Sequence, residues 1–372
     1  MESALSLRVG LITGIFPPDI GGPATFIPML MTELESSNIN YTVVTLSSKG
    51  PIFSKKDSNI VIRIPRALPK ALRFFFTNFV IFCLSFSVKK FYVNGLYEEF
   101  ALGNLFFRSR SVVKIVGDPI WERFRNRENS QIGIADFDHQ GMNLVWRLQR
   151  RLLNFSLNRS SVLVVPGKEL KKVVESWGLK PKVVQINNGV YPQLTLNHER
   201  TDCAIVVSRL VNWKNIHKAI VACHASGIPL LIFGEGPELE KLKEIQKSLK
   251  SSTEFFLSLS RTETIEMMRK HKYFLLLSEY EGQSFALLEA MSMGMIVVVS
   301  NITANTDVVE NELNGLVVNS SIQEDINQAL SKVSQNKPLQ DNMRVSSYEY
   351  IVRNHNFHEL AQLHINLLLK EV

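Results

Sequence analysis

Short apolar runs alternate with helical patterns along almost the whole chain, and this alternation constrains the fold more than any other feature. It is typical of a parallel sheet whose strands are joined by crossover helices. Thirteen runs are predicted as strands: Arg8–Thr13, Tyr41–Leu46, Ile60–Ile64, Lys90–Val93, Val112–Val116, Val162–Val165, Lys182–Ile186, Ala204–Val207, Leu230–Phe233, Thr253–Leu257, Tyr273–Leu277, Ile296–Val299 and Gly315–Val318.

The length of 372 residues exceeds one domain of ~150 residues and favours two. Turn residues and a proline interrupt the strand pattern at Asn187–Pro192. We therefore predict an α/β protein with two Rossmann-like doubly wound domains, residues 1–190 and 191–352. Helices are predicted at Ala24–Leu34, Glu238–Leu249, Phe285–Met293 and Phe357–Leu369.

Charge is distributed unevenly between the two halves. Residues 1–190 hold 25 Lys and Arg against 14 Asp and Glu, a net charge of +11, whereas the remainder has −4. A basic half favours anionic partners such as phosphates or lipid headgroups. The composition, 45% hydrophobic and 21% charged, excludes a disordered chain. Three scattered cysteines, Cys83, Cys203 and Cys223, predict buried thiols in a reducing compartment.

The N-terminus shows no basic segment followed by an apolar run, so we expect no secretory signal. No run reaches the roughly 20 uncharged apolar residues of a membrane span. These features predict a cytoplasmic protein, soluble or bound peripherally at the inner face of the cytoplasmic membrane.

A glycine-containing loop follows the first predicted strand. Gly21 and Gly22 precede Pro23, which suits the first turn of a helix. Glycines at this position let backbone N–H groups approach a phosphate, although a tight turn explains them equally well. The loop is neither a dinucleotide-binding fingerprint nor a P-loop.

Two cations open the second half. Arg209 and Lys214 come just after the strand Ala204–Val207, at the strand end where open α/β sheets bind ligands. Their spacing suits a diphosphate, and ordinary solvated loop cations are the alternative. A glycine turn, Gly234–Pro237, follows the next predicted strand.

The segment after Tyr273–Leu277 contains several candidate site residues close together. Gly282 and Ser284 open a predicted helix, and Glu281 and Glu289 stand on either side of its start. A helix N-terminus favours phosphate, and the two carboxylates are acceptors for sugar and ribose hydroxyls.

These motifs carry a family resemblance. Glu281 and Glu289 have the E-x7-E spacing of retaining glycosyltransferases with the GT-B fold, and EGQSFALLEAMSMG, starting at Glu281, resembles EGFGLVLLEAMACG of glycosyltransferase family 4 (glycosyl transferases group 1). The Arg209–Lys214 element, the Gly234–Pro237 element and the glycine pair match in the same order. The resemblance covers nearly the whole chain.

The resemblance implies two domains facing across a cleft, with a C-terminal helix, 353–372, packed back on the first. It implies a retaining hexosyltransferase that moves a sugar from a UDP- or GDP-linked donor to a glycan or lipid-linked acceptor in cell-surface polysaccharide or glycolipid biosynthesis. Catalytic roles fall on Arg209, Lys214 and Glu281. Donor contacts fall on Gly21, Gly22, Gly282, Ser284, Phe285 and Glu289.

The resemblance also implies that no metal or other cofactor is needed. Asp136 and Asp138 spell a D-x-D, but they lie in a charged segment instead of at a strand end. Many family members carry a histidine near the reacting sugar where this chain has Gly117 and Asp118. Asp118 is either a donor or acceptor contact or a loop-capping residue.

Two rival functions share parts of this pattern: a sugar-nucleotide epimerase with the same architecture, and a non-catalytic nucleotide- or glycan-binding protein. Nucleic-acid binding is not expected, because no recognised binding module appears.

The segment 68–90 is rich in phenylalanine. Phe75, Phe79, Phe82 and Phe86 share one helical stripe, flanked by lysines and arginines. A crossover helix buried against the sheet has this composition, and so does an interfacial helix on an anionic membrane. Both interpretations stay open on the sequence.

Overall fold

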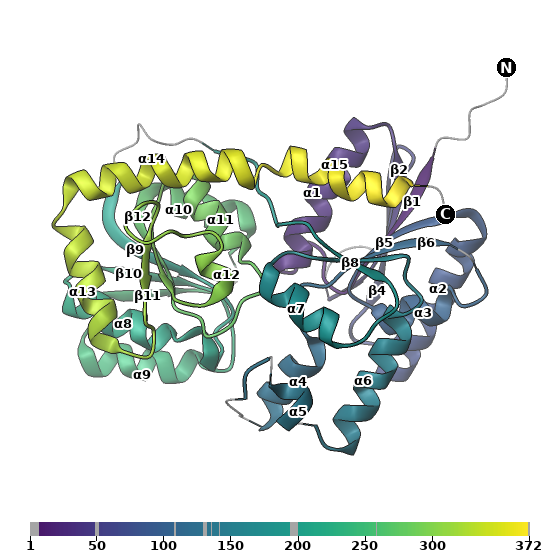
Figure 1. The fold of residues 1–372 in the computed structure, drawn as a ribbon, viewed down its shortest axis with the longest axis horizontal. Helices are drawn as coiled ribbons and strands as arrows, with labels where there is room; N and C mark the ends of the chain where they lie inside the picture. Colours follow the sequence, from purple (N-terminus) through teal and green to yellow (C-terminus); the bar gives the residue numbers. More distant parts are fainter. Residues whose placement is uncertain are drawn as a thin grey trace. The chain divides into compact units, whose positions relative to one another are not determined.

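The computed structural model describes residues 7–48, 52–107, 109–128, 132–134, 136–140, 142–193, 200–257 and 259–370. The chain forms two compact units (Figure 1), unit 1 with residues 1–187 and 358–372 and unit 2 with residues 188–357. The joint lies three residues before the predicted one at 190/191.

Unit 1 contains an eight-stranded sheet in the order β3-β4-β2-β1-β5-β6-β7-β8. All of its pairings are parallel except that of β3 with β4. The strands are β1 Arg8–Thr13, β2 Asn40–Ser47, β3 Phe53–Lys56, β4 Asn59–Pro65, β5 Lys90–Asn94, β6 Arg110–Lys114, β7 Val162–Val165 and β8 Lys182–Gln185. All seven predicted strands are present, and β3 is an additional one.

Helices cover both faces of this sheet. They are α1 Gly22–Ser36, α2 Lys70–Ser87, α3 Tyr97–Gly103, α4 Pro119–Glu128, α5 Phe137–Gln140, α6 Leu144–Leu157, α7 Lys168–Ser176 and α15 Phe357–Leu369. Phe91 and Tyr92 are consecutive in β5 and so point to opposite faces. Phe91 contacts Phe100 of α3, with ring centroids 5.2 Å apart, whereas Tyr92 contacts Phe26 of α1 and His364 of α15.

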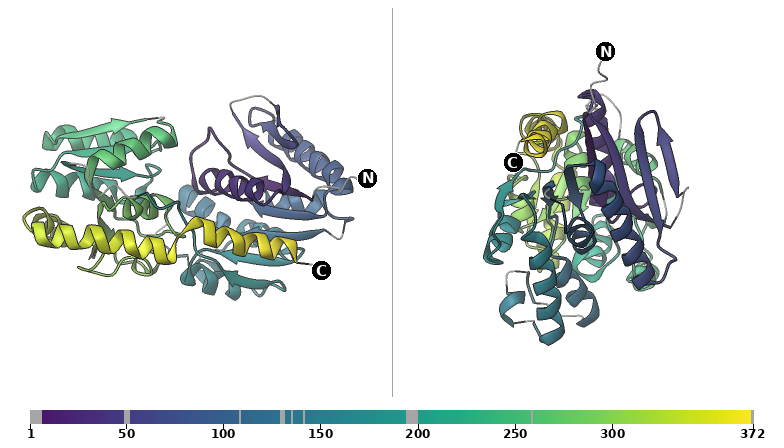
Figure 2. Two further views of the ribbon diagram at one scale, coloured as in Figure 1. Left: turned by 90° about the horizontal axis from the view of Figure 1, so that it is seen from above. Right: turned by 90° about the vertical axis from the view of Figure 1, so that its right-hand side faces the viewer.

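The C-terminal helix returns to unit 1, where it is drawn in yellow (Figure 2). The Tyr92 hydroxyl and His364 Nδ1 are 2.9 Å apart, and Lys90 Nζ donates to the carbonyl of Leu369 at 2.6 Å. The predicted start at residue 353 is wrong, because residues 353 and 354 end α14 and α15 begins at Phe357.

Unit 2 holds a six-stranded parallel sheet in the order β11-β10-β9-β12-β13-β14. Its strands are β9 Thr201–Val207, β10 Leu230–Phe233, β11 Thr253–Phe256, β12 His271–Leu276, β13 Ile296–Ser300 and β14 Leu316–Val318. Its helices are η1 Asn212–Lys214, α8 Ile216–Ala225, α9 Leu239–Leu249, α10 Arg261–Lys270, α11 Phe285–Ser292, α12 Thr303–Thr306, α13 Gln323–Ser334 and α14 Lys337–Asn354.

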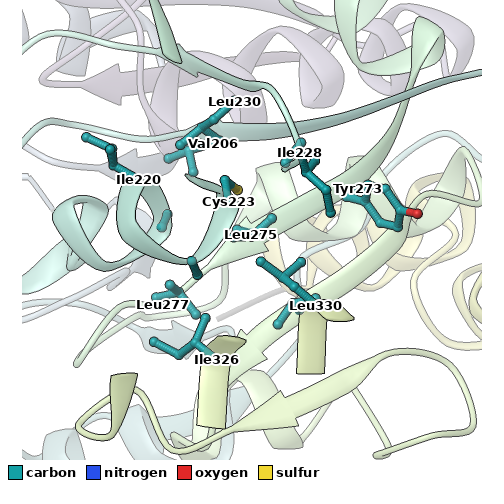
Figure 3. Packing of buried hydrophobic residues seen from close by; sticks show 14 of the residues in the cluster. Val206, Ile220, Cys223, Ile228, Leu230, Tyr273, Leu275, Leu277, Ile326 and Leu330 are labelled. Carbon is teal, nitrogen blue, oxygen red and sulfur yellow. The ribbon is translucent and has the colours of Figure 1, made fainter. Parts of the chain in front are cut away.

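The core of unit 2 fills the space between this sheet and its helices. Cys223 of α8 and Leu330 of α13 approach Leu275 of β12 from two sides (Figure 3). All three side chains are at most 1% exposed. Because neighbouring strands are buried on both faces, they read as continuous apolar runs, which is why the sequence predicts them well.

Helix α2 reverses the usual arrangement of a surface helix. Its Thr77, Ile81 and Ser85 are buried, whereas Phe75, Phe79 and other large apolar residues are exposed. The interpretation of the Phe stripe as core is therefore wrong. Cys83 is also exposed, contrary to the prediction of three buried thiols.

Among the described residues, α2 is the one helix whose length and composition suit a membrane span, and 17% of that window is buried. The sequence prediction considered only longer uncharged runs and did not single it out as a span.

Candidate active site

The sheet of unit 2 has a topological switch point between β9 and β12. The chain passes from β9 to β10 on one side, and β12 lies on the other side of β9. Crevices of this kind, at the carboxyl ends of the strands, are where open α/β sheets bind ligands. The loops after β9 and β12 carry Arg209, Lys214 and Glu281, so the structure brings these predicted residues to one edge of the sheet.

Hydrogen bonds join the two loops. Asn215, in the left-handed conformation with φ 51°, donates from Nδ2 to the carbonyl of Leu277 at 3.0 Å. The backbone N–H of Glu279 donates to the carbonyl of Trp213 at 2.8 Å, and Trp213 is buried. Asparagine tolerates this conformation better than most residues. Sequence reasoning missed Asn215, although its place after Lys214 was the available signal.

The joined loops place a cation against a carboxylate. Lys214 Nζ forms an ion pair with Glu281 Oε1, which also accepts from the Ser278 hydroxyl at 2.7 Å. The Lys214 and Glu281 side chains are only 13% and 11% exposed. A pair with so little water around it interacts more strongly than a surface pair. Arg209 lies on the same loop with an exposed side chain.

A small pocket opens beside Lys214. Its lining includes Ser208 after β9 and Ser278 after β12. The Ser208 hydroxyl is buried and has no hydrogen-bond partner within the described part of the chain. A buried hydroxyl without a partner is costly unless a ligand or water satisfies it. Ser208 is a further polar group at this site that sequence reasoning missed.

The glycines after β10 have a packing role. A Cβ on Gly234, whose φ is +149°, would lie 1.9 Å from the carbonyl oxygen of Ser208, and one on Gly236 would lie 2.3 Å from that of Leu210. The N–H of Leu210 donates to the carbonyl of Glu235 at 2.9 Å. The Gly234–Pro237 element therefore supports the backbone on either side of Arg209.

Helix α11 begins next to Glu281. Ser284 is its N-cap residue, and its hydroxyl accepts from the N–H of Leu287 at 3.3 Å. Phe285 is 8% exposed, so its side chain anchors the helix start while its backbone remains near the loop. The first N–H groups of a helix favour an anionic ligand. Gly282 lies two residues before the cap.

A buried network that sequence reasoning missed supports this helix start. Asn188 Nδ2 donates to the carbonyl of Gln283 at 2.9 Å, and the N–H of Asn188 donates to Gln283 Oε1 at 2.5 Å. His355 Nδ1 is 2.7 Å from the carbonyl oxygen of Asn188. Burial lowers the pKa of His355, so it stays neutral and Nδ1–H is the donor. No local sequence signal marks this network, because its members come from distant segments.

Glu289 projects from α11 and pairs with Arg261. Arg261 Nε donates to Glu289 Oε1 at 3.1 Å, and its second nitrogen contacts the same oxygen. The Arg261 side chain is 47% exposed and that of Glu289 11%. Burial raises the pKa of Glu289, and Arg261 acts in the opposite direction. Arg261 starts α10 behind a capping box of Ser260 and Glu263. Sequence reasoning missed it.

The predicted glycine pair lies in unit 1. Gly21 is the N-cap of α1 with φ 150°, and Gly22 is the first helical residue. Arg66 holds the loop by donating to the carbonyl of Gly14 at 2.6 Å and to Asp19 Oδ2 at 3.0 Å. The φ of Gly21 accounts for a glycine there without a ligand. Its contact with a donor remains a prediction.

Asp118 is buried and caps a helix. Its Oδ1 accepts from the N–H groups of Ile120 and Trp121 at 2.9 and 3.2 Å, and its Oδ2 pairs with Arg150. The side chain is 1% exposed. Of the two roles left open by the sequence, the structure shows loop capping, and both oxygens that a donor or acceptor would need are already engaged.

Asp138 of the D-x-D also contacts Arg150, whereas Asp136 is exposed. Asp138 Oδ1 lies 3.0 Å from the same Arg150. Among the described residues, no group of three or more His, Cys, Asp or Glu is placed to hold a metal ion.

Comparison with known proteins shows what the chain is similar to. Residues 192–350 match the family model of glycosyl transferases group 1. The alpha-monoglucosyldiacylglycerol synthase of Streptococcus pneumoniae is 23% identical over 323 residues, which cover 78% of this chain and 70% of that protein. Residues 192–350 are thus similar to the glycosyl transferases group 1, and the chain has the GT-B fold.

Solved structures of GT-B glycosyltransferases share the fold over the whole chain. Sucrose-phosphate synthase from Thermosynechococcus elongatus aligns with a TM-score of 0.77 at 14% identity, covering 97% of this chain and 98% of that one. HepE of Anabaena, solved in complex with UDP and glucose, aligns with a TM-score of 0.75 at 12% identity, covering 97% and 99%. The predicted α/β architecture with two Rossmann-like domains is confirmed.

Proposed function

We propose that this GT-B glycosyltransferase is a retaining family 4 enzyme that transfers a hexose from a UDP-sugar to a glycan or lipid-linked acceptor. The observation that supports the proposal most is the position of the Lys214–Glu281 pair at the β9/β12 switch point, next to the start of α11. A cation, a carboxylate and a helix N-terminus at one edge suit a sugar diphosphate.

Each charged residue has a proposed role. Arg209 and Lys214 hold the diphosphate and stabilise the charge that develops on the leaving phosphate. Glu289 accepts hydrogen bonds from the ribose diol through Oε2, since Arg261 already occupies Oε1. Glu281 accepts from a hydroxyl of the donor sugar once the diphosphate attracts Lys214 away from it.

The proposed reaction retains the anomeric configuration. The bond between the anomeric carbon and the phosphate oxygen breaks, and a bond to the acceptor oxygen forms on the same face of the sugar. The acceptor proton passes to the leaving phosphate oxygen, so no protein general base is required. The engaged oxygens of Asp118 agree with this scheme, because Asp118 is then not needed as a base.

UDP as the nucleotide and a lipid-linked or glycan acceptor are inferred from relatives. HepE was solved with UDP and glucose, and the Streptococcus relative is named a synthase of a glucosyldiacylglycerol. We place the enzyme in the cytoplasm, in the biosynthesis of a surface polysaccharide or glycolipid.

The test is a panel of UDP- and GDP-linked hexoses with a mixed pool of lipid and glycan acceptors. Nucleotide release that depends on the acceptor supports a transferase, and NMR of the product's anomeric proton reports its configuration. Inversion of configuration, or conversion of the donor without any acceptor, would overturn the proposal and favour another reaction of the fold.

A further inference from the structure

Helix α2 exposes one continuous apolar stripe. Leu72, Phe75, Phe76, Phe79 and Phe86 are 49%, 64%, 45%, 54% and 63% exposed. Their spacing repeats every three or four residues, so they lie along one side of the helix. A soluble surface helix normally places such a stripe against the core, and here it faces outward.

The opposite side of α2 packs against the rest of unit 1. Thr77, Ile81 and Ser85 are buried there. A Cβ on Gly103 of α3 would lie 2.8 Å from the carbonyl oxygen of Asn78 and 2.9 Å from Ile81. Only a glycine permits this close approach of α3 to α2. The orientation of α2 is therefore fixed by packing, and the phenylalanines are held outward.

Helix α6 presents a second stripe on the same unit. Leu144, Leu148, Leu152 and Phe155 are 82%, 58%, 53% and 50% exposed, and they also recur at helical spacing. The buried side of α6 holds Trp146, Leu153 and Leu157. Helix α6 thus has more apolar residues than it buries against the rest of unit 1.

The two stripes are linked through the segment after α3. Phe107 contacts Phe82 and Phe86 of α2, with ring centroids 5.5 and 5.0 Å apart. Arg159, just after α6, donates to the carbonyl of Leu105 at 2.7 Å. Helix α3 packs against both α2 and α6, and the intervening Phe106 is 82% exposed.

Cations border this surface, and carboxylates are absent from both helices. Lys70 in α2 and Arg147 and Arg151 in α6 are exposed, and neither helix contains Asp or Glu. Lys89 Nζ lies 5.1 Å from the centre of the Phe107 ring. The basic excess of +11 in residues 1–190 has the same sign. Apolar side chains bordered by cations complement an anionic lipid surface.

We propose that the α2–α6 surface docks the enzyme on the surface of an anionic lipid bilayer. The surface consists of Leu72, Phe75, Phe76, Phe79, Phe86, Phe106, Leu144, Leu148, Leu152 and Phe155, with Lys70, Arg147 and Arg151 at its border. The apolar side chains enter the boundary between headgroups and acyl chains, while the cations contact anionic headgroups. Docking does not depend on the donor chemistry proposed above.

Helix α2 lies on the bilayer and does not cross it. It connects β4 to β5, which belong to one sheet, and its buried side packs on α3. Crossing would require both contacts to be lost. A helix of this kind, apolar on one side only, belongs at the interface.

The test is co-sedimentation of the full chain with vesicles of phosphatidylcholine containing phosphatidylglycerol, and with vesicles of phosphatidylcholine alone. We expect binding to the anionic vesicles at low salt, release near 1 M salt, where the Debye length is about 3 Å, and little binding to neutral vesicles. The variant F75S/F79S/F86S should bind at least about tenfold more weakly, and so should R147Q/R151Q.

Matched controls separate docking from general surface effects. L363S changes an exposed leucine on α15, which packs on the other face of the sheet, and K241Q/K337Q removes two exposed lysines of unit 2. Both should bind as the wild type does. Every variant must keep its far-UV circular dichroism and its thermal shift with UDP, so that a failure of docking is distinguishable from a failure of the donor site.

Three results would overturn the proposal. One is the absence of binding to anionic vesicles at low salt. Another is equal binding by the wild type and F75S/F79S/F86S. The third is a dimer in size-exclusion chromatography that this triple substitution converts to a monomer, because a second copy of the chain would then cover the surface.

Discussion

Lys214 and Glu281 lie 67 positions apart in the sequence, yet their side chains form an ion pair. The contact depends on the backbone hydrogen bond between Glu279 and Trp213, which ties the two loops together. Without a donor, each group neutralises the other in a largely buried place. Under the proposed function, a diphosphate that attracts Lys214 releases the Glu281 carboxylate for the sugar, and the pair then couples recognition of the two halves of a donor.

The first prediction concerns this pair. Lys214→Ala and Glu281→Gln should each reduce turnover by about 100-fold or more, because stabilisation of developing charge is typically worth several kcal/mol. The double variant should lose much less than the product of the two single losses, since the residues act as one unit. Steady-state kinetics with an identified donor provide the measurement, and near-normal turnover in both single variants would refute the site assignment.

The second prediction concerns Glu289. Glu289→Gln should weaken donor binding at neutral pH, because a carboxylate accepts hydrogen bonds from the ribose diol better than an amide does. Titration calorimetry with UDP measures this change. Arg261→Ala is the matched control: it leaves the carboxylate in place and should weaken binding less. Equal affinity of Glu289→Gln and the wild type would exclude the ribose contact.

The raised pKa of Glu289 predicts that stability and donor affinity depend on pH. Burial raises its pKa in the folded protein above the usual 4.5, so ionisation costs more in the folded state than in the unfolded state. The wild type therefore loses this part of its stability as pH rises from 4.5 through the raised pKa. Glu289→Gln should unfold at the same or a higher temperature than the wild type at neutral pH. Donor affinity of the wild type should fall as pH is lowered through the raised pKa. A lower unfolding temperature for Glu289→Gln would contradict the assignment.

Much of the fold could be predicted from the sequence, because strands buried on both faces are continuous apolar runs. Strand β3 was missed because Phe53–Lys56 is short and exposed. The direction of the α2 phenylalanines could not be predicted, since composition and spacing are the same for an inward and an outward stripe. The close approach of α3 to α2 at Gly103 fixes the orientation of α2, and with it the outward direction of these phenylalanines.

The candidate site was predictable where one segment carries it, as with Glu281, Ser284 and Glu289. Contacts between distant segments were not. The pairing of Arg261 with Glu289 spans 28 positions, and no local pattern marks it. Asp118 was ambiguous for the same reason, because the partner that engages it, Arg150, lies 32 positions away.

The third prediction distinguishes a structural role of Asp118 from a role in binding the substrate. Asp118→Ala removes a helix cap and leaves Arg150, 9% exposed, with Asp138 as its remaining carboxylate partner among the residues that the structure describes. We expect a loss of about 3 kcal/mol or more in the free energy of unfolding, measured by urea denaturation. The Michaelis constant for the donor should change little at a temperature where the variant is folded. A large change in that constant with unaltered stability would restore a substrate role.

The fourth prediction concerns metals. Treatment with EDTA should leave turnover unchanged, since in the proposed mechanism Lys214 and Arg209 supply the positive charge that a metal ion would otherwise supply to the diphosphate. A loss of activity that manganese restores would contradict this, and Asp136→Ala and Asp138→Ala would then identify the site.

The most direct test of the account is the thermal unfolding of the wild type and Lys214→Ala with and without UDP. A ligand at 100 times its Kd stabilises the folded state by about 2.7 kcal/mol. We expect a clear upward shift for the wild type and a shift largely lost in Lys214→Ala, whose unfolding without ligand stays close to that of the wild type. No shift in the wild type, or an equal shift in both proteins, would contradict the placement of the donor diphosphate at Lys214.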